Sequence, residues 1–151
     1  FTYILAYDNG INFALGSGLT SRLNKLCLCN EYSKEVITVI HYLSLENLSK
    51  IASSPKGKEE GITENIIRTA SGFLLSEVPE EVKNAVAVIM FTAIHLNGKK
   101  QCIYDNKQSI NTDIIVRLIT LLSNLDESLR KDVIECLRII AQLKETFLAI
   151  T

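Results

Sequence analysis

The sequence of 151 residues lacks tryptophan and contains only two prolines and seven glycines. Few residues that interrupt helices are therefore present, and no stretch has the composition of a flexible linker. Lys and Arg number 16 against 17 Asp and Glu, so neither sign of charge is in clear excess. This balance disfavours nucleic acid and an anionic membrane surface as partners.

The chain also lacks a long hydrophobic run, although 47% of its residues are hydrophobic. The longest run, 85–91, is far shorter than the span of about 20 residues that crosses a bilayer. We therefore expect a large core and no membrane insertion. The sequence opens on Phe1 without the basic start of a signal peptide, which favours an intracellular piece of a longer protein.

Cysteine is sparse, with Cys27, Cys29, Cys102 and Cys136 only. Four scattered cysteines do not make a disulfide framework, and neither histidine stands at a zinc-finger spacing from a cysteine pair. The pattern predicts reduced thiols, no metal and no other cofactor.

No cluster of residues has the spacing of a catalytic site. His41 has no Ser, Cys or carboxylate three or four residues away, and Gly16-Ser17-Gly18 lacks the strand and third glycine of a dinucleotide loop. Gly98-Lys99-Lys100 lacks the upstream glycine and the Ser or Thr of a phosphate-binding loop. We therefore expect no enzyme activity and no small-molecule substrate.

An internal repeat is the strongest positive signal. Three similar segments, 33–40, 82–89 and 130–137, align Lys34, Lys83 and Lys131 at spacings of 49 and 48 residues. A period of this size predicts stacked helical repeats, whose usual role is to hold other proteins.

Within each repeat the apolar periodicity predicts a short, a middle and a long helix. Ser33 is an expected cap for a long helix over 34–53, Pro79 opens another that Asn97-Gly98 ends, and Asp126 opens the last. Asn9-Gly10 is likewise read as a helix stop. With Gly10, Gly57 and Gly98 as starting points, the expected divisions are a repeat end at 1–9, repeats at about 10–56, 57–97 and 98–143, and the start of another at 144–151.

Three helices per repeat of roughly 40–47 residues is typical of the armadillo family. Residues 18–26 and 114–122 resemble its second helix, and 82–89 resemble its third. The resemblance implies an all-α, right-handed solenoid of armadillo repeats, about three in number, with cut ends.

A narrower resemblance lies in residues 81–94 with 97–101, which are similar to late repeats of the radial spoke head protein 14 family. It extends over about 34–145 and departs at an insertion, 105–109, and at a missing glycine before Lys144. The resemblance implies a structural subunit of the radial spoke in the ciliary or flagellar axoneme. Such a subunit packs against other spoke proteins and turns over no substrate.

In armadillo solenoids the third helices line a groove, and import receptors place Trp and Asn there to hold a basic peptide. The equivalent positions here hold neither residue, which disfavours a nuclear-localisation peptide as ligand. The expected protein-binding positions are Lys34, Thr38, Tyr42, Lys83, Ala87, Phe91, Lys131, Glu135 and Ile139. Two alternatives stay open: Tyr42 and Phe91 can pack inside the solenoid, and the lysines can be solvated and paired with nearby acids.

The function expected is therefore a non-catalytic scaffold that binds other proteins of a larger assembly. One alternative is an armadillo adaptor that captures an extended peptide in the cytoplasm. Another is the regulatory helical-repeat domain of a longer enzyme. Continued repeats in a longer sequence would favour the scaffold, and a flanking catalytic domain would favour the last alternative.

Overall fold

The computed structural model describes residues 4–143, so the expected start of another repeat at 144–151 lies outside the described residues. Apart from one isolated bridge between Tyr104 and Ile110, the described residues contain no β-structure. The prediction of an all-helical chain is confirmed. The elements are η1 (Ile4–Ala6), α1 (Asp8–Ala14), α2 (Leu19–Cys27), α3 (Lys34–Ala52), α4 (Pro55–Thr63), α5 (Ile66–Ser71), α6 (Pro79–Thr92), α7 (Leu96–Ile103), α8 (Asp113–Thr120), η2 (Leu121–Ser123) and α9 (Glu127–Ile140).

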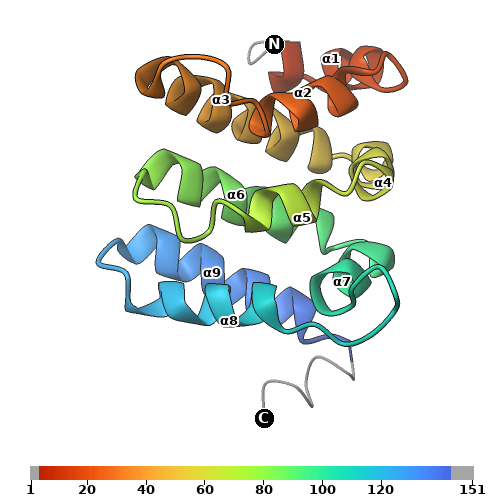
Figure 1. Cartoon of the computed structure of the whole chain (residues 1–151). Coiled ribbons are helices and arrows are strands. Elements are labelled where there is room, and N and C mark those ends of the chain that lie inside the picture. The colour runs from red at the N-terminus through yellow and green to blue at the C-terminus, as the bar shows by residue number, and fades with distance from the viewer. Residues whose placement is uncertain (1–3, 144–151) are drawn as a thin grey trace.

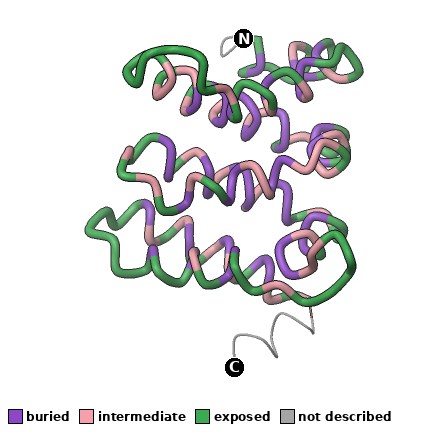
Figure 2. Tube along the Cα trace, viewed as in Figure 1, coloured by how far each residue is buried: buried purple, intermediate pink, exposed green. Residues whose placement is uncertain are grey.

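The helices form three layers, α1–α3, α4–α6 and α7–α9, stacked one on another (Figure 1). In each layer the third helix is the longest, and α3, α6 and α9 contact one another in that order. The buried residues lie between the layers and between the helices of each layer (Figure 2). Over residues 4–143, no helix is both long and apolar enough to cross a membrane.

The middle layer supplies much of the core. Ala85, Val86, Val88 and Ile89 of α6 are fully buried because α6 has a third helix on either side. This explains why the middle of α6 is apolar on most of its surface. In α3, by contrast, only the second half from His41 onward is buried, and the first half is exposed.

The starts of the long helices agree with the sequence signals. Pro79 occupies the first turn of α6, and the Asp126 side chain accepts a hydrogen bond of 3.2 Å from Leu129 N at the start of α9. Helix α3 begins at Lys34 as predicted, but the Ser33 side chain makes no capping hydrogen bond there.

The prediction that Asn9-Gly10 and Asn97-Gly98 end helices is wrong. Each glycine is instead the third residue of the first helix of its layer, as Gly57 is in α4. Their Cα atoms lie against the end of the preceding helical segment, and a Cβ would lie 1.8 Å from Ile4 O, 1.7 Å from Ile51 O and 2.0 Å from Thr92 O for Gly10, Gly57 and Gly98 respectively. Glycine is required here because two backbones approach closely, and not because a helix stops.

A buried lysine follows two of these glycines. Lys58 Nζ donates to Ser53 O at 3.1 Å, and Lys99 Nζ donates to Ile94 O at 2.8 Å. Each ammonium therefore binds a carbonyl just beyond the end of the preceding long helix, where the helix dipole favours positive charge. Burial lowers the pKa of both lysines.

Polar side chains also join the layers to one another. In four of these interlayer ties a side-chain nitrogen donates to a main-chain oxygen of another layer. They are Asn24 Nδ2 to Glu64 O (2.9 Å), Asn84 Nδ2 to Tyr42 O (3.2 Å), Gln101 Nε2 to Ile62 O (2.9 Å) and Arg117 Nη1 to Ser71 O (2.9 Å). Since all four involve the middle layer, this layer fixes the spacing of the stack.

Candidate protein-binding surface

The nine positions predicted to bind protein lie on α3, α6 and α9, the third helices of the layers. Within each helix the three positions are four residues apart and so lie on one face. Lys34, Lys83 and Lys131 are exposed. Thr38, Tyr42, Ala87, Phe91 and Glu135 are half-buried, and Ile139 is buried.

The packing register of α3 against α6 differs from the register of the sequence repeat. Asn84 Nδ2 lies 3.2 Å from Tyr42 O, so Tyr42 lies beside the residues that follow Lys83 and not beside Phe91. Gly57 and Gly98, which have the same structural role, are 41 residues apart, whereas Lys34 and Lys83 are 49 apart. The difference of eight residues amounts to two helical turns, or about 12 Å along the helix axis.

The repeat spacing agrees better with the structure between α6 and α9. Their C-caps, Ala93 and Ala141, are 48 residues apart, the same spacing as Lys83 and Lys131. The structure therefore brings the predicted residues of α6 and α9 to the same level, while Lys34 lies about two turns towards the free start of α3.

The three lysines differ in their local pairing. Lys131 Nζ lies 3.2 Å from Glu127 Oε1 on the exposed face of α9. Over residues 4–143 Lys34 and Lys83 make no such ion pair. Glu135 receives two hydrogen bonds from Arg138, which lower the pKa of its carboxyl, so this position is already occupied by a local partner.

The aromatic and aliphatic positions are divided between core and surface. Phe91 packs against the hydrophobic core, and Ile139 belongs to it. Tyr42 is half-buried beside Asn84. Lys83 and Ala87 are thus the most accessible predicted positions in the middle of the stack.

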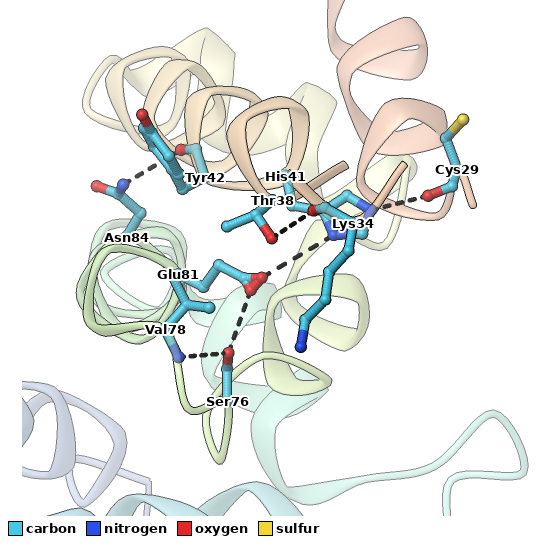
Figure 3. Close-up of polar contacts among 9 residues, drawn as sticks. All are labelled: Cys29, Lys34, Thr38, His41, Tyr42, Ser76, Val78, Glu81 and Asn84. Atoms are coloured by element: carbon cyan, nitrogen blue, oxygen red, sulfur yellow. Dashed lines mark hydrogen bonds and ion pairs between the residues drawn. The ribbon is translucent and has the colours of Figure 1, made fainter. Parts of the chain in front are cut away.

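A polar cluster lies where α3 meets α6 (Figure 3). His41 Nε2 lies 2.9 Å from Cys29 O, and His41 Nδ1 lies 4.0 Å from Glu81 Oε1. Ser76 Oγ donates to Glu81 Oε2 at 3.1 Å and accepts from Val78 N at 3.1 Å. The cluster therefore connects the loop before α3, helix α3, the loop before α6 and helix α6.

The geometry of His41 fixes its hydrogen-bonding role. A carbonyl only accepts, so Nε2 carries a proton and donates it to Cys29 O. In the neutral ring Nδ1 would then direct a lone pair at the Glu81 carboxylate, so a proton on either group makes the contact favourable. The ring also packs edge-on against Phe73, with centroids 5.1 Å apart. His41 and Glu81 are both buried, so the cluster binds two layers together.

Sequence reasoning missed the pairing of His41 with Glu81. It considered only carboxylates close to His41 along the chain, and it assigned Glu81 to the positive start of α6. Glu81 does lie in that first turn, but it is also buried against the preceding layer. A glutamate next to an apolar segment with proline two residues before it gives no signal of this tertiary partner.

All four cysteines are free thiols, and Cys27, Cys102 and Cys136 are buried. Burial raises the pKa of Cys27 and of Cys102 to about 12, and it raises that of Cys136 well above its ordinary value. Cys29 is half-exposed.

Comparison with known proteins finds no family model that matches the chain, and no curated protein that matches it.

Proposed function

We propose that the chain is a stretch of armadillo-type α-solenoid that works as a non-catalytic scaffold and binds other proteins of a larger assembly. The observation that carries the proposal is the row of third helices, α3, α6 and α9, each following two shorter helices. The repeated glycine contacts and the four interlayer ties support a fixed spacing between the layers. A rigid row of parallel elements suits the binding of an extended partner.

The assembly we propose is the radial spoke of the axoneme, following the resemblance of residues 81–94 and 97–101 to late repeats of the radial spoke head protein 14 family. The binding face is the part of the row where α6 and α9 are in register. Lys83 and Lys131 are its exposed cations, so we expect acidic groups on the partner at that level.

Affinity purification of the tagged protein from ciliated cells, followed by mass spectrometry of the axonemal salt extract, tests this proposal. Radial-spoke subunits should co-purify with the native protein. The double variant Lys83→Glu, Lys131→Glu should lose them, because it reverses the charge of the face without touching the core.

The matched control is Lys25→Glu with Lys107→Glu, which reverses two exposed lysines on α2 and on the loop between α7 and α8. It should retain the partners, and circular dichroism should show equal helix content in all three proteins. Recovery of soluble cytoplasmic partners alone would remove the spoke assignment and favour a general adaptor. Equal loss in the control would contradict the assigned face.

A further inference from the structure

The loops that join the second helix of each layer to the third share one property. They comprise residues 28–33, 72–78 and 124–126, and they lie along one edge of the stack, which we call the loop edge (Figure 1). His41 connects the first two, since its ring contacts Cys29 O and Phe73. Ser76 and Glu77 line the same cavity as Asn124 and Leu125, which connects the last two.

Each of these loops presents one large apolar side chain to solvent. Tyr32 is 60% exposed, Leu75 is 57% exposed and Leu125 is 97% exposed. Isolated exposed apolar residues are common on protein surfaces. One in the same loop of every layer, aligned along one edge, is a pattern of the kind that marks an interaction surface.

A cavity of about 470 Å³ lies beside Leu125, between the starts of α6 and α9. Pro79, Val82 and Leu129 supply apolar atoms to its wall. This hollow can receive a side chain of a bound partner, so the loop edge has both apolar contacts and a pocket between them.

The charge of the loop edge is strongly one-sided. Counting the loops and the first two residues of the helix that follows each, it contains six exposed carboxylates and one lysine. The carboxylates are Glu31, Glu35, Glu77, Glu80, Asp126 and Glu127, and the lysine is Lys34. Glu127 is paired with Lys131, whereas the chain as a whole is nearly neutral. A partner that places apolar groups on this edge therefore gains from basic residues on either side of them.

The spacing of the layers selects the shape of that partner. Packed helices lie about 8–10 Å apart, so three layers place their exposed apolar residues over about 20 Å. One heptad of an α-helix rises about 10.5 Å, so apolar residues seven apart on a helix match successive layers. We propose that the loop edge docks a basic amphipathic helix of a partner protein, which lies along the stack axis with one apolar residue per layer.

Binding of a synthetic peptide to the purified chain tests this proposal. The probe is a fluorescein-labelled helix of about three heptads, with leucine at one position of each heptad and Lys or Arg on both flanks. Fluorescence anisotropy should show saturable binding that weakens as salt is raised. A second peptide with serine in place of the leucines, and a third with glutamate on the flanks, should not bind.

Variants of the chain locate the site. Leu125→Ser and Leu75→Ser should each weaken binding by about tenfold, as loss of a buried apolar anchor does. Phe13→Ser is the matched control: Phe13 is 83% exposed on α1, away from the loop edge, so its removal should leave the affinity within about twofold. Glu77→Lys with Glu80→Lys should weaken binding and reduce its dependence on salt, whereas Glu59→Lys on α4 should not.

Equal affinity of the native chain, Leu125→Ser and Phe13→Ser for the basic peptide would overturn the proposal. Self-association that Leu125→Ser abolishes, with no binding of peptide, would assign the edge to a second copy and would also overturn it. The assay uses purified components and different residues from the charge reversals at Lys83 and Lys131, so its failure is distinguishable from failure of the proposed scaffold function.

Discussion

His41 Nδ1 and Glu81 Oε1 lie 4.0 Å apart in the interior, on α3 and α6 of adjacent layers. The other ring nitrogen is hydrogen-bonded to Cys29 O, and the carboxylate receives the Ser76 hydroxyl. Truncation of either residue leaves the other buried without its partner. Such truncation generally costs more than the interaction itself contributes.

We therefore predict that His41→Ala lowers the free energy of unfolding by about 2–4 kcal/mol, measured by urea denaturation. The control is His95→Ala, because His95 is half-buried and only caps α7 by accepting from Asn97 N; we expect a loss of about 1 kcal/mol or less.

A double-mutant cycle with Glu81→Gln should give a coupling energy of at least about 1 kcal/mol. Strictly additive effects of the two substitutions would show that the contact does not join the layers energetically.

The glycines at the corners between layers give the second prediction. Gly98→Ala places a methyl group 2.0 Å from Thr92 O, so the first turn of α7 must move away from the end of α6. We expect a loss of about 3 kcal/mol or more, seen as a fall in thermal midpoint.

Gly72→Ala is the matched substitution for this test. The nearest atom to its added Cβ lies at 3.3 Å, and its φ of −66° suits alanine. We expect an effect within about 1 kcal/mol, and in the stabilising direction if the backbone does not move. Similar losses at positions 72 and 98 would contradict the close approach of the two backbones.

The third prediction concerns thiol chemistry. A thiol with a pKa of about 12, as for Cys27 and Cys102, has roughly one molecule in ten thousand as thiolate at pH 8. The native chain should therefore react with iodoacetamide at Cys29 first, and mass spectrometry should show one added group.

In urea all four cysteines should react, because unfolding exposes the buried thiols. The variant Cys29→Ser should remain unlabelled under native conditions over the same time. Fast native labelling of Cys102 or Cys136 would mean that α7 or α9 opens readily.

The sequence was sufficient to predict the helical class and the starts of the long helices. Pro79 and Asp126 carry local signals, since a proline in the first turn and a capping carboxylate act within a few residues. The roles of Gly10 and Gly98 could not be read in this way. Glycine after asparagine is a common stop signal, and only the tertiary approach to Ile4 O and Thr92 O distinguishes the two roles.

The register of the candidate surface was predictable only in part. Lys83 and Lys131 are placed at one level because α6 and α9 have equal lengths. Helix α3 has five more residues than α6, 19 against 14, and the similarity around Lys34 falls in its exposed first half. Sequence similarity between repeats aligned the helix starts, whereas packing aligns the helix ends.

The interlayer ties have one further consequence. Their acceptors are main-chain oxygens of Tyr42, Ile62, Glu64 and Ser71, so the identity of those four side chains does not enter the hydrogen bond. Only the donors, Asn24, Asn84, Gln101 and Arg117, must keep their chemistry. The acceptor positions are free to vary on the outer surface, so a lineage of such proteins can acquire new partners there while the distance between layers stays constant.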